Sequence, residues 1–304
     1  MAVLLEVAGY IPPGRIPISE IGERSGISPS DLMVFRHFFG LDTVSVAPDT
    51  DLPGLLTAAA RRLTQLADNA GQVRYLLHAR TSAIPDGTSS PLDQIRADLH
   101  LHNARTLALN HHACASGLLA LDHAAELLAA DPDPCALALV LVGDKLDEVG
   151  MHMLPGITFL GEAAAACLMR QGGDGDRLLA RATRILDGEA ELFTRSPEEC
   201  LDTLADVILA ALDDARTDLA DLALVLPHNV NRISWVRLCE RIGYPIDRVY
   251  LDNVAVTGHC FGADPLLNYC GARDRQLLRP GERYAMVSVG WDTTFTALIL
   301  ECQS

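Results

Sequence analysis

The stretch Asn110-His111-His112-Ala113-Cys114-Ala115-Ser116-Gly117 joins two different hydrophobic patterns. Residues 104–109 before it form a run of strand length, and residues 117–130 after it carry apolar side chains at helical spacing. This junction predicts that Cys114 lies at a strand-to-helix corner, where unpaired N–H groups and the helix dipole favour a thiolate. Cys114 is therefore a candidate nucleophile. The alternative is a small buried apolar residue, which is the commoner role of any one cysteine.

Two further strand ends carry histidines. Residues 222–226 predict an apolar strand that ends at His228, and residues 248–256 predict another that ends just before His259. Fully apolar strands that alternate with helices indicate an α/β fold around a buried sheet, and such folds place their sites beyond the strand ends. We therefore expect Cys114, His228 and His259 to form one site. Taken singly, each histidine would be read as a surface or core residue.

The run Gly172-Gly173-Asp174-Gly175 is the best candidate for a joint in the chain. The pattern after it repeats the pattern before it in outline. We therefore divide the chain into an N-terminal half, residues 1–174, with Cys114, and a C-terminal half, residues 175–304, with both candidate histidines.

Composition excludes several classes of function. The 304 residues include 24 Lys and Arg against 40 Asp and Glu, a formal charge of -16, which argues against extensive binding of nucleic acid or an anionic membrane. The eight cysteines form no Cys-x-x-Cys pair, which indicates reduced thiols and no metal site. No signal peptide or membrane span is recognisable. We expect a cytoplasmic protein.

These motifs, in this order, resemble the thiolase superfamily and most closely beta-ketoacyl-acyl-carrier-protein synthase III. The resemblance rests on Ala113-Cys114-Ala115-Ser116-Gly117, on Pro227-His228-Asn229-Val230-Asn231-Arg232 and on the glycine-rich turn near residue 260. It implies a thiolase-like five-layered αβαβα fold built from two similar βαβαβαββ halves, and a homodimer. It also implies an acyl group carried as a thioester on the cysteine, and His228 matches the catalytic histidine of the family.

The departures from synthase III concern the second histidine and the C-terminal loop. This chain has Gly258-His259-Cys260 where synthase III enzymes have Gly-Asn-Thr. The sequence of this chain is here similar to the turn of thiolases and elongating synthases. The lysine that elongating synthases carry shortly before this histidine is missing. The glycine-rich C-terminal loop of the family reads Val289-Gly290-Trp291 here, and no segment matches the one that helps synthase III enzymes hold the adenine of coenzyme A. These departures favour a role in specialised biosynthesis over fatty-acid initiation.

The resulting hypothesis is a thioester-dependent acyltransferase or condensing enzyme without a tightly bound cofactor. Cys114 would take an acyl group from coenzyme A or a phosphopantetheine carrier, and backbone N–H groups near Cys114 and Gly290 would hold the oxyanion. His228 and His259 would then act on the acceptor. A decarboxylative condensation with a malonyl-type thioester is favoured, and transfer to an oxygen or nitrogen nucleophile is the alternative. An alternative of another class is a non-catalytic partner subunit of a condensing-enzyme heterodimer.

The predicted helix after His228 carries a basic cluster in an acidic chain. Arg232, Arg237 and Arg241 resemble the surface on which the family docks acyl carrier protein, and Asn231 resembles its contact to the pantetheine arm. The alternative for the arginines is a solvated helix face that balances local acids.

Overall fold

The computed structural model describes residues 1–81, 91–146, 152–186, 195–291 and 293–303. Within these ranges one sheet holds nine strands in the order β11-β12-β13-β10-β1-β9-β6-β4-β5. Its strands are β1 (Ala2–Tyr10), β4 (Val73–Ala79), β5 (Arg105–Leu109), β6 (Leu137–Gly143), β9 (Ala164–Gln171), β10 (Asp176–Ile185), β11 (Leu222–Pro227), β12 (Arg283–Gly290) and β13 (Thr294–Glu301). Short strands β2 (Gly14–Pro17) and β3 (Thr43–Val46) pair with each other, as do β7 (Met153–Leu154) and β8 (Thr158–Phe159).

The helices are α1 (Ile18–Ser25), α2 (Pro29–His37), α3 (Leu52–Ala60), α4 (Pro91–Asp98), α5 (Ser116–Ala130), α6 (Pro197–Asp214), α7 (Arg232–Ile242), α8 (Val254–Thr257) and α9 (Asp264–Asp274). Local sequence explains where several of them begin. The Ser196 hydroxyl accepts a hydrogen bond from Glu199 N (3.1 Å) and so caps α6, which has Pro197 at its first position. Asn231 caps α7 in the same way through Ser234 N (2.9 Å).

The large sheet consists of two similar parts that meet at β1 and β10. Strands β5, β4 and β6 run parallel, and β9 and β1 follow in antiparallel pairing. On the other side β11 and β12 are parallel, and β13 and β10 follow in antiparallel pairing. The two parts are joined by antiparallel pairing of Val3 with Arg177 and of Leu4 with Asp176. We therefore propose that the halves divide at residues 174 and 175, in the turn between β9 and β10.

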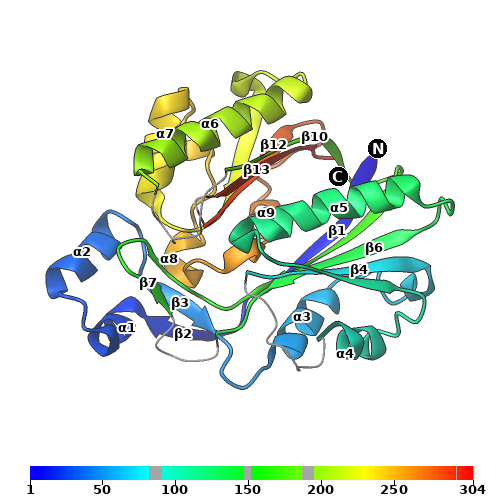
Figure 1. Ribbon diagram of the computed structural model, residues 1–304, viewed down its shortest axis with the longest axis horizontal. Coiled ribbons are helices and arrows are strands. Elements are labelled where there is room, and N and C mark those ends of the chain that lie inside the picture. The colour runs from blue at the N-terminus through cyan, green and yellow to red at the C-terminus, as the bar shows by residue number, and fades with distance from the viewer. Residues whose placement is uncertain (82–90, 147–151, 187–194, 292, 304) are drawn as a thin grey trace.

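Helices cover both faces of each part of the sheet (Figure 1). Helix α3 packs on β6 and β9 with α4 beside it, and α6 packs on β10 and β13 with α7 beside it. Helices α5 and α9 lie between the two parts of the sheet, because α5 contacts β6 and β12 and α9 contacts β1 and β11. The order helix, sheet, helix, sheet, helix confirms the five-layered α/β fold that the resemblance implied.

Helix α5 is mainly apolar and packs against both halves, and its polar residues Asp122, His123 and Glu126 are partly or fully exposed. With the preceding turn, the segment Ala113–Ala130 is long and apolar enough to cross a membrane by composition, but 61% of it is buried inside the protein. Most of its leucines and alanines belong to the central hydrophobic core, together with residues of α9 and of strands from both halves. This segment is therefore read as a core helix.

The strand predicted over residues 248–256 is wrong. The structure has a short 3₁₀ turn (Ile246–Arg248), one parallel bridge between Val225 and Val249, and then helix α8. Asp252 and Asn253 disfavour strand structure, and Asn253 accepts hydrogen bonds from Val256 N (3.1 Å) and Thr257 N (2.9 Å) through its carbonyl oxygen, which begins the helical turn. Among the described residues, the C-terminal half thus has only this single bridge beside β11, where the N-terminal half has β5 beside β4.

Candidate active site

Cys114 lies in a sharp 3₁₀ turn (Ala113–Ala115) between β5 and α5, as the sequence predicted. The corner needs left-handed backbone at His111 (φ 69°) and Ala113 (φ 44°). Strand β12 of the other half holds it in place, because the Ser288 hydroxyl donates to the Cys114 carbonyl oxygen (2.9 Å). Gly290, at the end of β12, lies so close that a Cβ atom there would collide with the His112 carbonyl oxygen. Cys114 is thus positioned by both halves.

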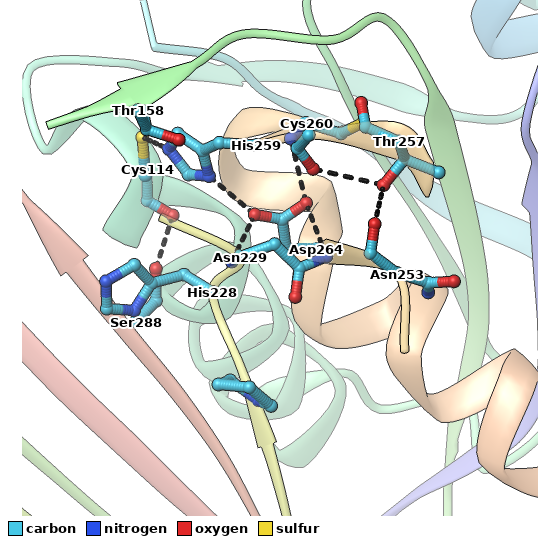
Figure 2. A network of polar contacts seen from close by, with 12 residues as sticks. Cys114, Thr158, His228, Asn229, Asn253, Thr257, His259, Cys260, Asp264 and Ser288 are labelled. Carbon is cyan, nitrogen blue, oxygen red and sulfur yellow. Dashed lines mark hydrogen bonds and ion pairs between the residues drawn. The ribbon is translucent and has the colours of Figure 1, made fainter. Parts of the chain in front are cut away.

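His259 faces Cys114 from the C-terminal half (Figure 2). Its backbone N–H donates to Phe159 O (2.9 Å), and its carbonyl oxygen accepts from Gly161 N (3.0 Å). Its Nε2 lies 3.1 Å from Cys114 Sγ, within hydrogen-bonding distance. The imidazole is 2% exposed, so water does not compete for this contact.

Asp264 completes the arrangement, and the sequence reasoning missed it. The carboxylate is fully buried at the start of α9, and its Oδ2 lies 2.5 Å from His259 Nδ1. It also accepts hydrogen bonds from Asn229 N (2.6 Å) and Cys260 N (2.8 Å). The signal in the sequence was an acidic residue five positions after His259, at a helix start marked by Pro265. Cys114, His259 and Asp264 form the chain of contacts of a nucleophile, base and orienting carboxylate.

The carboxylate determines which nitrogen of His259 faces the sulfur. Since Asp264 accepts at Nδ1, the neutral ring carries its proton on Nδ1 and presents a free electron pair at Nε2. Burial alone would lower the pKa of His259, but the negative charges of Cys114 and Asp264 outweigh burial and raise that pKa to about 10. The ring is therefore suited to take a proton at Nε2 and to hold it.

His228 lies just beyond the end of β11, where its backbone N–H donates to Val287 O (3.0 Å). Its ring meets the rings of Trp235 and His259 edge to face, with centroids 5.4 and 6.1 Å apart. Burial and the neighbouring His259 lower the pKa of His228 to about 3, so the ring is neutral at neutral pH. Within the described residues, its Nδ1 has no hydrogen-bond partner.

Three buried or partly buried asparagines form a chain of hydrogen bonds that ends at Asp264. Asn229 Nδ2 donates to Asp264 Oδ1 (3.2 Å), and Asn268 Nδ2 donates to Asn229 Oδ1 (2.8 Å) and to Pro227 O (2.7 Å). Asn253 Nδ2 donates to Asn268 Oδ1 (2.8 Å). The network links α9 to the ends of the segments that carry His228 and His259, and so fixes both histidines relative to each other.

The remaining predicted residues have other partners. Asn231 is 5% exposed, and besides capping α7 it donates through Nδ2 to Ile157 O (3.3 Å). Arg237 pairs with Glu198 of α6, and Arg241 pairs with Glu198 and Asp202. Arg232 is exposed at the start of α7 and has no salt bridge to any residue that the structure describes. Across the same ranges, no group of three or more His, Cys, Asp and Glu side chains could hold a metal ion.

Comparison with known proteins supports the resemblance. Residues 212–302 match the family model of the C-terminal part of 3-oxoacyl-[acyl-carrier-protein] synthase III. Over 80 residues the chain is 34% identical to the beta-ketoacyl-[acyl-carrier-protein] synthase III of Nitratidesulfovibrio vulgaris. In these segments the chain is similar to synthase III enzymes. That alignment covers 26% of this chain and 24% of the relative, so it spans about a quarter of each protein.

Solved structures extend the likeness in fold to the full length of the chain. ChlB3, an acyltransferase, superposes with a TM-score of 0.86 at 19% identity, covering 100% of this chain and 98% of its own. FabH, the synthase III of Pseudomonas aeruginosa PAO1, gives 0.85 at 18% identity and the same coverage. OleA of Xanthomonas campestris gives 0.82 at 18% identity, covering 99% of this chain and 98% of its own. At these identities the likeness establishes the fold.

Proposed function

We propose that this protein is an acyltransferase that takes an acyl group from a coenzyme A or carrier-protein thioester onto Cys114 and passes it to an oxygen or nitrogen nucleophile. The observation that carries the proposal is the chain of contacts from Cys114 Sγ through His259 to Asp264. A thiol beside a base that a buried carboxylate orients is the arrangement that nucleophilic acyl transfer requires.

In the first half-reaction the Cys114 proton passes to His259 Nε2, and the thiolate attacks the thioester carbonyl. Backbone N–H groups at the Cys114 corner and near Gly290 are the proposed donors to the oxyanion, since these two segments are in contact. The bond from the carbonyl carbon to the carrier sulfur then breaks. The electron pair leaves on that sulfur, which receives the proton from His259.

The second half-reaction favours transfer over condensation. An incoming hydroxyl or amine can give its proton to the free electron pair at His259 Nε2 and attack the acyl carbon. A decarboxylative condensation instead needs N–H donors that stabilise an enolate. In the acyl-enzyme, after His259 has given its Nε2 proton to the departing carrier sulfur, its remaining N–H is turned toward Asp264, and so the ring offers no such donor to the substrate.

Decarboxylative condensation with a malonyl-type thioester is the second candidate. It is favoured by the resemblance to synthase III and by His228, a neutral imidazole whose ring lies beside His259. A non-catalytic partner subunit is less consistent with this site, because Cys114, His259 and Asp264 retain mutual contact. The departures in the C-terminal loop support a specialised biosynthetic role.

Intact-mass measurement tests the proposal. Incubation with a panel of acyl-coenzyme A and acyl-carrier thioesters should add one acyl mass, which Cys114→Ala abolishes and Cys135→Ala retains. Cys135 is the matched control because its thiol is exposed and lies outside the site. Acylation that persists in Cys114→Ala, or none with any thioester, would contradict the proposal. Addition of a malonyl carrier to the acyl-enzyme then decides the second half-reaction, since release of carbon dioxide with loss of the acyl group would establish condensation.

A further inference from the structure

Cys114 has a second polar neighbour that the mechanism above does not use. The Thr81 hydroxyl oxygen lies 3.9 Å from Cys114 Sγ, within hydrogen-bonding range for sulfur. Thr81 is half-buried and follows the end of β4 by two residues, so it reaches the sulfur from the N-terminal half. His259 reaches the same sulfur from the C-terminal half.

The backbone of Thr81 is held by a buried acid. Asp144, one residue beyond the end of β6, is 4% exposed and accepts a hydrogen bond from Thr81 N at both carboxylate oxygens (3.0 and 3.1 Å). Strands β4 and β6 are parallel neighbours, so their carboxyl ends lie side by side and bring these residues together. The position of the hydroxyl therefore depends on packed elements of the sheet.

We propose that the Thr81 hydroxyl is a catalytic hydrogen-bond donor that stabilises the Cys114 thiolate, both as nucleophile and as leaving group. The inference rests on the proposed acyl transfer. When the acyl-enzyme breaks down, the carbon–sulfur bond cleaves and the electron pair stays on Cys114 Sγ, while the acceptor's proton is still on His259 Nε2. A second donor stabilises the sulfur before His259 returns that proton.

Among the described residues, charged and titratable groups of both halves lie on the two sides of the Thr81–Cys114–His259 contacts. His259 contacts the sulfur directly, and Asp264 contacts the other nitrogen of its ring. Asp144 binds the backbone of Thr81, and Arg80 Nε lies 4.0 Å from Asp144 Oδ1. His112, two residues before Cys114, faces Thr294 instead (3.1 Å). A neutral hydroxyl thus contacts the sulfur from the N-terminal half, and its loss should change the behaviour of the thiolate without changing any charge.

The test compares Thr81→Val, which removes the hydroxyl at nearly constant volume, with Thr81→Ser, which keeps it. Alkylation of Cys114 by iodoacetamide is measured against pH, and decay of a preformed acyl-enzyme is measured in single turnover. We expect Thr81→Val to move the alkylation midpoint to higher pH and to slow the decay about tenfold, the effect of one hydrogen bond to a charged group. Thr81→Ser should behave like the wild type.

Thr57→Val is the matched control, because Thr57 is a buried threonine in α3 whose hydroxyl has no hydrogen-bond partner in the described part of the chain. It should leave both measurements unchanged. A Thr81→Val variant with wild-type alkylation and decay would overturn the inference, and so would equal losses in the Val and Ser variants. Alkylation needs no acyl donor, so it decides the role of Thr81 even if no thioester acylates Cys114 and the proposed function fails.

Discussion

The Asp264 carboxylate is the residue on which the chemistry of His259 depends. Its Oδ2 faces His259 Nδ1 and accepts from Asn229 N, and its Oδ1 accepts from Cys260 N and Asn229 Nδ2. An asparagine at this position has only one acceptor oxygen, so in either orientation its amide group would face an N–H donor. Asp264→Asn should therefore release His259 from its tautomer while it preserves the shape of the side chain.

We predict that Asp264→Asn lowers the rate of acyl transfer about 10³-fold or more, as loss of the orienting acid does in such triads. The pKa of His259 should fall as well, because a negative charge that raises it is removed. Single-turnover rates against pH would show both effects. Asp274→Asn, at the exposed far end of α9, is the control. A transfer rate within a few-fold of the wild type would show that Asp264 has only a structural role.

Sequence reasoning placed Cys114 and His228 beyond the ends of strands, because periodicity locates such ends, whereas the strand it expected before His259 is instead a 3₁₀ turn and helix α8. Asp264 escaped it because the carboxylate reaches His259 across a 3₁₀ turn (Phe261–Ala263), and no periodicity reports which side chain lies inside a turn. Thr81 escaped it for a similar reason. Its contact with Cys114 joins residues 33 positions apart, and such a pairing exists only after β4 and the corner are packed.

At the scale of single elements, the structure changes the interpretation of the arginines of α7. The sequence shows three arginines that could attract an acidic carrier protein. The structure pairs Arg237 and Arg241 with acids of α6, and exposed pairs of this kind leave little net field. Arg232, at the amino end of α7, is the remaining candidate for carrier docking on this helix.

We therefore predict that Arg232→Ala lowers kcat/KM for a carrier-borne acyl donor about 3–10-fold, with a weaker salt dependence, since a rim charge acts mainly on the association rate. Arg237→Ala should change this parameter by less than twofold. The same acyl group on coenzyme A serves as the control donor, because it lacks the acidic carrier surface. Equal losses in the two variants would show that the whole helix docks the carrier, and no loss in either would exclude α7 as the docking site.

The segment over residues 248–256 shows where the prediction of a single element from sequence fails. Val249, Tyr250 and Leu251 have strand-like composition, but only Val249 forms a bridge. The apolar side chains there pack under α7 and α9 instead, as buried Val249 and Tyr250 show. The apolar residues of this segment are buried against helices and not within a strand. Composition alone does not distinguish these two cases.

At the scale of the whole molecule, the family resemblance implied the five-layered fold. The apolar strands and helices by themselves indicated only a layered α/β fold, because apolar faces must be buried. Strands such as β6 and β9, apolar on both faces, require helices on both sides, and α5 requires a sheet on each side. The pairing of β1 with β10 was not predictable, since both strands also have partners within their own halves. It places the two halves so that Cys114 and His259 meet.

Within the described part of the chain, one edge of the nine-stranded sheet has no further strand beside it. There β5 pairs with β4 only, and residues 105–108 are exposed, including Leu107 at 36%. An exposed edge strand has backbone N–H and C=O groups without partners and readily adds a strand from another chain. Because β5 leads directly into the Cys114 corner, we propose that two copies of the protein pair through β5 and that the dimer supports the nucleophile.

This pairing predicts that Leu107→Lys converts a dimer to a monomer, because two lysines would face each other across the interface while the charged side chain remains accessible in the monomer. Sedimentation velocity would measure the change, and alkylation of Cys114 would show whether the corner loosens with it. Leu209→Lys on α6 is the matched control, since Leu209 is exposed to a similar degree (45%) on another face. A wild-type protein that sediments as a monomer, or a Leu107→Lys variant that remains dimeric, would rule out β5 as the interface.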